Sequence, residues 1–418
     1  MAGGNSDAST QRVATQVAVA AAGAALAYYV GSRSKNVKRA AAQRRAKAVA
    51  QAKAAALPTD LERRKLTSVV VRVPATTANM GPGFDTIGMA LDIWTEISVE
   101  VVAPKEGDAP NVRRITLTNE GEGAKELPTD ESNLVIVGIK AAFKAAGEEM
   151  PRHLKVHCKN RIPFARGLGS SSAGIVGGII AGLALAGMRL PVHGREELLQ
   201  LVKQLRLASE IEGHPDNVAP AIYGGLQLGI FADDRWYSSR VQIPDGLQCV
   251  VFIPDSTGPT SVARAILPPD VPRKDAVFNI GRAAIFVNAF RSGNLDELRY
   301  ATQDMLHQPQ RGAAQYPHLD PLMKAALGAG AHGCFLSGAG PTVLAITSGR
   351  AGDIFTQQLA ERQENKVANA MREAAAAMGV SGCVFITNPD HRGAFIVRAE
   401  PQFSDRSVAR YEGDVADL

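Results

Sequence analysis

Residues 161–187 read R-I-P-F-A-R-G-L-G-S-S-S-A-G-I-V-G-G-I-I-A-G-L-A-L-A-G, a glycine-serine loop followed directly by an apolar run of helical character. Gly167 and Gly169 permit a positive φ and a close approach of the backbone, and the serines at 170–172 can cap the helix that follows. The N–H groups at such a helix start attract anions, so the stretch indicates a phosphate-binding loop. A capped, glycine-rich core or transmembrane helix would give the same local pattern, and the rest of the chain must decide.

Composition places the chain among ordinary globular proteins. It has 418 residues, of which 45% are hydrophobic and 21% charged, enough for two domains with cores of their own. The four cysteines and eight histidines are dispersed, without a CxxC or CxxH grouping that would indicate a disulfide framework or a zinc site. This cysteine usage fits a reducing compartment.

The positive charge of the chain is concentrated in its first 66 residues. This leader carries twelve Lys or Arg against three acids, a net charge of +9, so the remaining body carries −4 of the total of +5. No basic stripe with interleaved aromatic residues occurs in the body, so we expect no nucleic acid as a partner. The leader is rich in alanine and serine and includes an apolar run at 13–30, a composition typical of organelle-targeting peptides.

We therefore expect residues 1–66 to be a disordered or cleaved targeting leader. The plastid (chloroplast) stroma is the expected destination, ahead of a mitochondrial or cytoplasmic location. A membrane anchor with a basic flank is the alternative, because the apolar run has about the minimum length of a membrane span. Contact with a membrane is expected only if the leader is such an uncleaved anchor.

Hydrophobic periodicity predicts a mixture of strands and helices from residue 67 onward. It predicts a strand at 68–74 that ends at Pro74, and a helix at 132–146 with Ser132 as its N-cap. Further elements expected in this half are strands through 94–102 and at 153–159, and a helix at 195–209.

The second half continues the alternation of strands and helices. The expected elements are strands at 226–231 and 247–254, helices at 261–267, 274–290 and 295–305, a long helix ending at 378, and a closing pair of strands. This order favours an α+β protein. We expect an N-terminal domain at 67–230, a C-terminal domain at 231–400 and a polar tail at 401–418.

A second polar cluster lies in the sequence E-I-E-G-H-P-D-N-V-A-P-A-I-Y-G-G at residues 210–225. Within eight residues it gathers Glu210, Glu212, His214, Asp216 and Asn217. Taken alone, the cluster is equally well explained as a capped turn between two helices or as part of a site.

Three glycine-rich signatures in this order resemble those of the GHMP kinases. They are V-P-A-T-T-A-N-M-G-P-G-F-D at 73–85, P-F-A-R-G-L-G-S-S-S-A at 163–173 and S-G-A-G-P-T at 337–342. The resemblance extends over residues 69–397 and implies a two-domain fold, with an N-terminal ribosomal-protein-S5-like ATP-binding domain and a C-terminal ferredoxin-like α/β domain. No G-K-[ST] follows the loop, so it is not a Walker A motif.

Within this superfamily the chain is most similar to homoserine kinases. The N-x-G-P-G-F-D turn, the 210–225 cluster, T-S-V-A-R-A-I-L-P at 260–268 and H-Q-P-Q-R at 307–311 carry this similarity. It implies ATP-dependent phosphorylation of the side-chain hydroxyl of L-homoserine in threonine biosynthesis. Homoserine and ATP would be the ligands, and a homodimer is the assembly to test.

The resemblance also implies roles for individual residues. The substrate would be held by Asn79, Asp85, His214, Asp216, Asn217, Thr260, Arg264 and Arg311. ATP would be held by Asn133, Pro163, Arg166, Gly167, Leu168, Gly169, Ser170, Ser171 and Ser172. Mg²⁺ would be held by Ser170, Ser171 and Glu212, and the residues nearest the chemistry would be Glu212, Asn217 and Ser170.

These roles agree with the chemistry of the ligands. A zwitterionic substrate needs an anion for its ammonium group and a guanidinium for its carboxylate, and Mg²⁺ prefers oxygen ligands. The E-G-H-P spacing favours Glu212 over Glu210 as the metal ligand. The general base stays open, with Asp216 and His214 as alternatives, because direct in-line transfer depends mainly on positioning and charge neutralisation.

Two departures from the family pattern stand within the motifs. Met80 replaces a leucine, and Gln310 replaces an aromatic residue beside Arg311. The alternatives are another GHMP small-molecule kinase, of mevalonate-pathway type, or a catalytically inactive nucleotide or metabolite sensor. The first would not need paired ammonium- and carboxylate-binding residues, and the second predicts a damaged loop, which the sequence does not show.

Overall fold

The strand predicted after the leader belongs to a seven-stranded sheet. In this computed structural model, which describes residues 66–104, 113–188, 205–233, 235–348 and 362–401, β1 (Ser68–Ala78) lies between β2 (Ile87–Val101) and β11 (Phe395–Glu400). The strand order is β11-β1-β2-β4-β3, with β4 (His153–Asn160) parallel to β3 (Arg114–Gly121). β5 (Leu226–Ala232) pairs with β2, and β6 (Arg235–Val241) pairs with β5.

β1 continues through Pro74, where the sequence predicted its end. Its register with β2 shifts between Pro74 and Ala75, so the proline lies at a bulge, where its missing N–H interrupts the ladder only locally. The strand therefore carries Thr76, Thr77 and Ala78 onward into the first glycine-rich signature.

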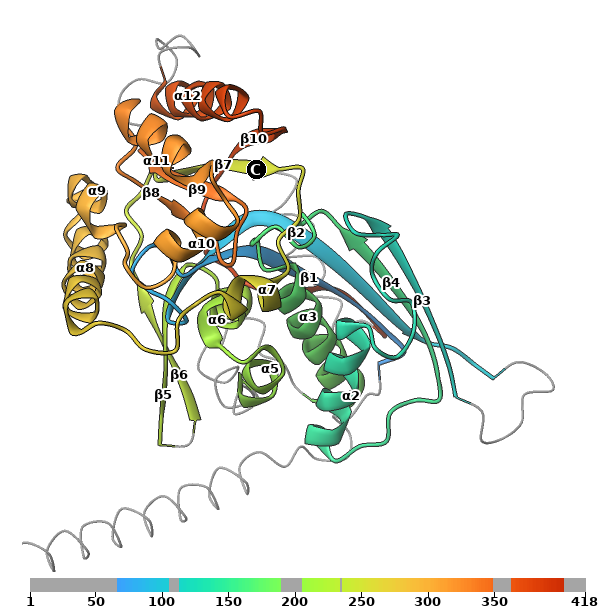
Figure 1. The fold of residues 1–418 in the computed structure, drawn as a ribbon. Helices are drawn as coiled ribbons and strands as arrows, with labels where there is room; N and C mark the ends of the chain where they lie inside the picture. The colour runs from blue at the N-terminus through green and yellow to red at the C-terminus, as the bar shows by residue number, and fades with distance from the viewer. Residues whose placement is uncertain (1–65, 105–112, 189–204, 234, 349–361, 402–418) are drawn as a thin grey trace, which may run out of the picture. The chain divides into compact units, whose positions relative to one another are not determined.

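Four helices cover one face of this sheet (Figure 1). They are α2 (Leu134–Ala146), α3 (Ser170–Leu185), α5 (Leu205–Glu212) and α6 (Pro215–Tyr223). α3 is the apolar run behind the glycine-serine loop, and its glycines let it lie close against α2: a Cβ on Gly178 would stand 2.2 Å from the Val135 carbonyl oxygen. The run is thus a core helix, and in the described part of the chain no helix has the length and apolarity to span a membrane.

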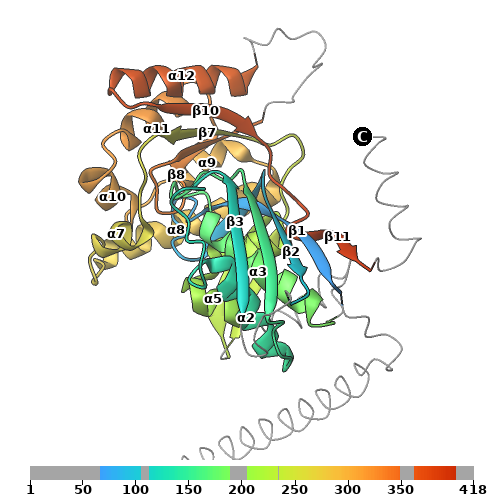
Figure 2. The same cartoon turned by 90° about the vertical axis from the view of Figure 1, so that its right-hand side faces the viewer.

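The second sheet has four antiparallel strands in the order β10-β7-β9-β8. These are β7 (Gln248–Pro254), β8 (Gly333–Leu336), β9 (Val343–Thr347) and β10 (Gly382–Thr387). Helices α11 (Leu319–Gly328) and α12 (Gln363–Ala377) pack together on one face of it (Figure 2). The remaining helices are α7 (Thr260–Ala265), α8 (Arg273–Ser292), η3 (Leu295–Glu297), α9 (Leu298–Ala301) and α10 (Gln308–Ala314).

The α+β class is confirmed, but the two closing strands do not form a pair. β10 completes the small sheet, whereas β11 returns to the large sheet and pairs with β1. β6 also belongs to the large sheet. The division expected at residue 230 therefore does not coincide with the division between the sheets.

Two helix predictions also need correction. The helix expected at 295–305 is the short η3 and α9, which end at Ala301, because the Asp304 carboxylate takes the backbone N–H groups that start α10. The N-cap of α2 is Asn133 and not Ser132: Asn133 Oδ1 accepts the Val135 N–H at 2.9 Å. The leader, all but the end of the helix at 195–209, and the tail beyond 401 lie outside the described residues.

Candidate active site

The three glycine-rich signatures meet through hydrogen bonds between their backbones and short side chains. The Thr76 N–H donates to the Leu168 carbonyl at 3.1 Å, which joins the first signature to the second. Ser337 Oγ donates to the Gly167 carbonyl at 2.7 Å, and Asn79 Nδ2 donates to the Gly338 carbonyl at 2.8 Å. Segments far apart in the sequence thereby form one rigid floor.

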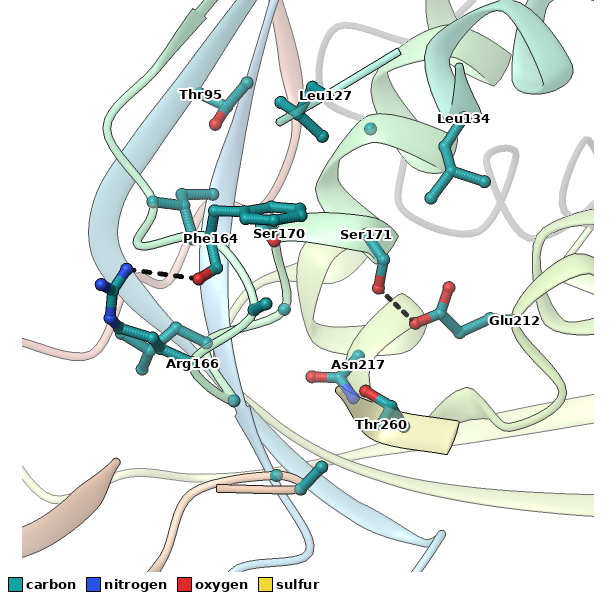
Figure 3. A pocket seen from close by; sticks show the side chains of 18 of the residues that line it. Thr95, Leu127, Leu134, Phe164, Arg166, Ser170, Ser171, Glu212, Asn217 and Thr260 are labelled. Atoms are coloured by element: carbon teal, nitrogen blue, oxygen red, sulfur yellow. Dashed lines mark hydrogen bonds between the residues drawn. The ribbon is translucent and has the colours of Figure 1, made fainter. Parts of the chain in front are cut away.

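A cavity of about 330 Å³ opens above this floor (Figure 3). Most of the predicted site residues line it: Asn79, Asp85, Asn133, Arg166, Gly167, Leu168, Gly169, Ser170, Ser171, Glu212, His214, Asp216, Asn217, Thr260, Arg264 and Arg311. Pro163 and Ser172 are not among the lining residues.

The glycine-serine loop ends at the first turn of α3, as the sequence predicted. Gly167 and Gly169 have φ of +74° and +73°, and Gly169 is the N-cap of the helix. A Cβ on Gly169 would stand 1.9 Å from Thr76 Oγ1, so only glycine fits here. The loop and the first residues of α3, Ser170 and Ser171, line the cavity. The N–H groups at a helix start have no partner within the helix, which suits phosphate oxygens.

Glu212 reaches the same turn from the end of α5. Ser171 Oγ and Ser172 Oγ both donate to its Oε1, at 2.7 and 2.9 Å. Within the described residues its Oε2 accepts no hydrogen bond. Ser170 lines the cavity but makes no hydrogen bond to this carboxylate, whereas the buried Ser172 does.

Two residues expected to hold nucleotide have their polar atoms bonded to backbone. Arg166 donates from Nε to the Pro254 carbonyl, from Nη1 to that of Phe164 and from Nη2 to that of Asp255, which ties the loop to the end of β7. Asn133 caps α2 and donates to the Pro128 carbonyl. Both residues therefore shape the cavity through backbone contacts.

At the other end of the cavity, Asp85 and Arg264 form a two-pronged ion pair, with N–O distances of 2.7 and 2.9 Å. This partner raises the pKa of the Arg264 guanidinium. Asp216 and His214 lie beside them, and ligand atoms of Asp85, His214 and Asp216 are all within 4.8 Å of one another. Burial opposes the charged imidazole, but the hydrogen bond and charge of Asp216 raise the pKa of His214.

Arg311 extends from α10 into the same end of the cavity, where it is almost fully buried. Its Nε donates to the Ala263 carbonyl at 3.1 Å, and its Nη1 donates to the Gly338 carbonyl at 3.1 Å. Burial, with the nearby charge of Arg264, lowers the pKa of this guanidinium. Two guanidinium groups and a cluster of acidic groups thus share one end of the cavity.

Asn217 lies between the loop and this charged end. Thr76 Oγ1 donates to Asn217 Oδ1 at 2.8 Å, and Asn217 Nδ2 donates to Asp216 Oδ1 at 3.4 Å, so both ends of the amide are oriented. Thr76 was not predicted as a site residue, because a threonine beside the asparagine and aspartate of the first signature carries no distinctive signal. Its contact with Asn217 depends on pairing between segments 141 residues apart.

The sequence also missed the apolar end of the cavity. Leu127, Pro128, Val135, Ile162 and Phe164 line it, together with the polar side chain of Asn119. Several of these residues come from the segment read as a polar excursion before α2. Phe164 stands in the second signature and Ile162 just before it, but Asn119, Leu127 and Pro128 lie in no motif. Residues of this kind are hard to predict, since any set of apolar residues can line such a wall.

The family models match both halves of the chain. The GHMP kinases N terminal domain matches residues 133–225, and the GHMP kinases C terminal domain matches residues 286–377. Among solved structures, a homoserine kinase from Cytophaga hutchinsonii superposes with a TM-score of 0.66 at 26% identity, covering 82% of this chain and 100% of that one. A mevalonate diphosphate decarboxylase from Staphylococcus aureus, with a TM-score of 0.55 at 14% identity, shares the fold.

Curated relatives agree with the structural match. A homoserine kinase from Carboxydothermus hydrogenoformans is 38% identical over 326 residues, which are 78% of this chain and 96% of that protein. A homoserine kinase from Moorella thermoacetica is 40% identical over 328 residues, 78% of this chain and 99% of that protein. The chain therefore belongs to the homoserine kinase family of the GHMP kinases.

Proposed function

We propose that the protein transfers the γ-phosphoryl group of ATP to the side-chain hydroxyl of L-homoserine. The observation that carries this proposal is the Asp85–Arg264 ion pair, which lines the same cavity as the glycine-serine loop. A zwitterionic amino acid can replace this one pair by two, its ammonium group meeting Asp85 and its carboxylate meeting Arg264 and Arg311. Mevalonate has a carboxylate but no ammonium group, so it would leave Asp85 unpaired.

The nucleotide occupies the opposite part of the cavity in this proposal. Its phosphates lie on the N–H groups of residues 167–172 at the start of α3, where the helix dipole favours negative charge. Its base lies against the apolar wall that includes Leu127, Ile162 and Phe164. The γ-phosphoryl group then points toward Asn217 and the substrate hydroxyl, as in-line transfer requires.

The residues around Glu212 fit Mg²⁺. The site offers a carboxylate oxygen that accepts no hydrogen bond from described residues, next to two serine hydroxyls, and hard oxygen ligands of this kind suit the ion. Ser171 and Glu212 would hold it, with Ser170 at the cavity wall. The ion would supply charge neutralisation for the transferred group.

The remaining catalytic work is positioning. Thr76 orients the amide of Asn217, and one of its two N–H donors lies toward Asp216. The other can donate a hydrogen bond to the substrate hydroxyl, whereas an amide is too weak a base to take the hydroxyl proton. His214 and Asp216 stand as alternative proton acceptors. A loose phosphoryl-transfer transition state needs little help from a general base, so positioning and charge neutralisation carry most of the rate.

The proposed function is tested by a coupled assay of ATP consumption with the full chain. Homoserine, mevalonate, galactose and serine are offered separately at equal concentration. We expect turnover with homoserine alone. Turnover with mevalonate or galactose, and none with homoserine, would overturn the proposed substrate and favour another GHMP kinase.

Gly169→Ala is expected to lower kcat/KM for ATP by about tenfold or more, because the left-handed φ costs a side chain about 1–2 kcal/mol and the loop must also shift. The added Cβ would stand 1.9 Å from Thr76 Oγ1 and 3.2 Å from Asn217 Oδ1. Steady-state kinetics measure the effect. Gly147→Ala is the matched control, since Gly147 has φ of +70° and no atom within 4 Å of the added Cβ. Equal kinetics in both variants would contradict the expectation.

Thr76→Val removes the hydroxyl that orients Asn217 while it keeps the shape of the side chain. We expect kcat to fall about tenfold with little change in the KM for ATP, the scale of one misplaced hydrogen bond in the transition state. Thr76→Ser, which retains the donor, should stay close to wild type. A Thr76→Val enzyme with wild-type kcat would show that Asn217 needs no such orientation.

We also propose that residues 1–66 carry the protein into plastids. One support is the net charge of +9 and the alanine-rich composition of this segment. Another is that the two bacterial relatives align over 96% and 99% of their own length with only 78% of this chain. Fusion of residues 1–66 to a fluorescent protein tests the proposal. Stromal fluorescence is expected, and retention at a membrane or in the cytosol would contradict it.

A further inference from the structure

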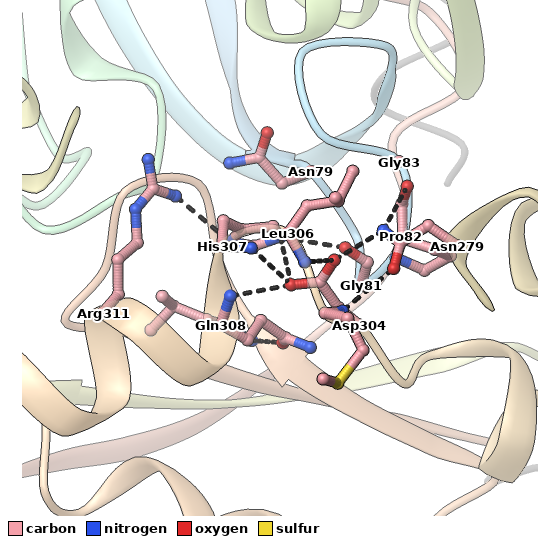
Figure 4. Close-up of polar contacts among 12 residues, drawn as sticks. Asn79, Gly81, Pro82, Gly83, Asn279, Asp304, Leu306, His307, Gln308 and Arg311 are labelled. Carbon is pink, nitrogen blue, oxygen red and sulfur yellow. Dashed lines mark hydrogen bonds and ion pairs between the residues drawn. The ribbon is translucent and has the colours of Figure 1, made fainter. Parts of the chain in front are cut away.

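A fully buried histidine stands between the two groups of substrate-binding residues (Figure 4). His307 Nε2 lies 2.9 Å from the Gly81 carbonyl, in the turn that also carries Asn79 and Asp85. Its Nδ1 lies 3.2 Å from Nη1 of Arg311. One imidazole ring thus contacts the segment assigned to the ammonium group and the guanidinium assigned to the carboxylate.

These two contacts fix the state of the ring. A carbonyl oxygen can only accept and a guanidinium can only donate, so Nε2 carries the proton and Nδ1 offers its lone pair. A second proton, on Nδ1, would face Arg311 with no acceptor. Burial lowers the pKa of His307, although the charge of Asp304 acts in the opposite direction. The lowered pKa favours the neutral ring.

Asp304 holds the backbone at His307 in place. Its Oδ2 accepts the backbone N–H groups of His307 and Gln308 at 2.8 and 2.7 Å, and its Oδ1 accepts that of Leu306 at 2.9 Å. Asn279 of α8 donates to the same Oδ1 at 2.6 Å. Four donors therefore fix this carboxylate, and with it the start of α10.

Phe84 adds a second contact among the same groups. Its ring lies 5.4 Å from the His307 ring, and the guanidinium carbons of Arg264 and Arg311 lie 5.4 and 5.5 Å from its centre. Phe84 belongs to the same turn as Asp85. The turn, both arginines and His307 are thus packed around one aromatic ring.

We propose that His307 is a positioning residue that sets Arg311 against the turn at residues 79–85, and so fixes the spacing between the carboxylate and ammonium subsites. This inference rests on the proposed function. It assigns the two ring nitrogens different tasks, Nδ1 for the carboxylate side and Nε2 for the ammonium side. The hydrogen bonds of each can be removed separately.

Two substitutions make that separation. His307→Gln places an amide N–H near the position of Nε2, so it keeps the Gly81 contact and loses the acceptor for Arg311. His307→Asn places an amide oxygen near the position of Nδ1, so it keeps the Arg311 contact and loses the one to Gly81. His318→Gln is the matched control, because His318 is also buried and bonds a carbonyl, but that carbonyl belongs to Pro341 and not to the turn at residues 79–85.

The readouts are the KM values for homoserine and ATP and the inhibition constants of two fragments. 4-Hydroxybutanoate lacks the ammonium group, and 3-amino-1-propanol lacks the carboxylate. For His307→Gln we expect weaker binding of 4-hydroxybutanoate by about tenfold and of 3-amino-1-propanol by less than about threefold, since one hydrogen bond to a charged group is lost. For His307→Asn we expect the larger loss of binding for 3-amino-1-propanol and the smaller one for 4-hydroxybutanoate. The KM for ATP should be unchanged in both variants.

The outcomes separate this inference from the proposed function. Failure of the wild-type protein to phosphorylate homoserine would overturn the proposed function and, with it, the inference. If the wild type is active, equal losses of both fragments in both variants, or wild-type binding in both, would overturn the inference alone. Opposite fragment preferences in the two variants, with His318→Gln unchanged, would support it.

Discussion

Replacing Glu212 with glutamine is expected to lower kcat by about two to three orders of magnitude, the scale seen when one charge-stabilising group is removed from an active site. The substitution preserves shape and removes the negative charge that Ser171 and Ser172 orient at 2.7 and 2.9 Å. Without that charge the proposed Mg²⁺ would lose its protein carboxylate, and the charge on the transferred phosphoryl group would be less well neutralised. Steady-state rates at saturating homoserine and ATP, with Mg²⁺ titrated, measure the loss.

Glu210→Gln is the control for this substitution. It removes one negative charge two positions earlier in α5, so a general effect of charge on the helix would appear in both variants. We expect Glu210→Gln to keep kcat within about threefold of wild type, as for most changes outside a site. If Glu212→Gln kept the wild-type kcat, or if Glu210→Gln lowered kcat more than Glu212→Gln, Glu210 and not Glu212 would be the metal ligand.

Arg264→Leu is expected to raise the KM for homoserine by about a hundredfold, since it removes a bidentate carboxylate contact worth several kcal/mol when partly desolvated. It also leaves Asp85 without its partner. The KM for ATP should change by less than about threefold, because uniform binding energy is lost only at the substrate end. Initial rates over a matrix of both substrates give the two constants.

Two further measurements make this result specific. Arg264→Lys keeps the charge but lacks the planar fork, so its KM for homoserine should lie between those of the wild type and the leucine variant. The Asp85 and Arg264 side chains are 32% and 44% exposed, so loss of their pair should change Tm little. A raised KM for ATP with an unchanged KM for homoserine would contradict the assignment of this end of the cavity.

Much of the site could be predicted because its residues stand in short, ordered motifs. Gly167 and Gly169 in the loop are required for a local reason, positive φ, so sequence alone was informative there. The prediction that the serines at 170–172 cap α3 was wrong: Gly169 is the N-cap without a side-chain hydrogen bond, and Ser171 and Ser172 donate to Glu212 instead. The charged residues at 212–217 and at 264 could be read from their chemistry once the family pattern was recognised. Site residues could thus be predicted where they belong to a short family motif or where the backbone conformation requires a particular residue type.

The residues that sequence missed depend on contacts between distant segments. His307 stands in the same motif as Arg311, but only its burial between Gly81 and Arg311 gives it a task. Thr76 gains its task from Asn217, 141 residues away. Likewise the helix expected at 295–305 ends early because Asp304 accepts N–H groups of the next helix, a competition that periodicity cannot detect.

The pairing of β11 with β1 has a consequence for the synthesis of the protein. Thr67 donates its N–H to the Glu400 carbonyl at 2.7 Å, so strands from the two ends of the folded body close the large sheet. Until residue 400 has left the ribosome, the outer side of β1 has unpaired N–H and C=O groups, a state open to association with other chains. Contacts of such high sequence separation also form slowly. A newly made chain therefore cannot complete its large sheet until residues 395–400 have been added.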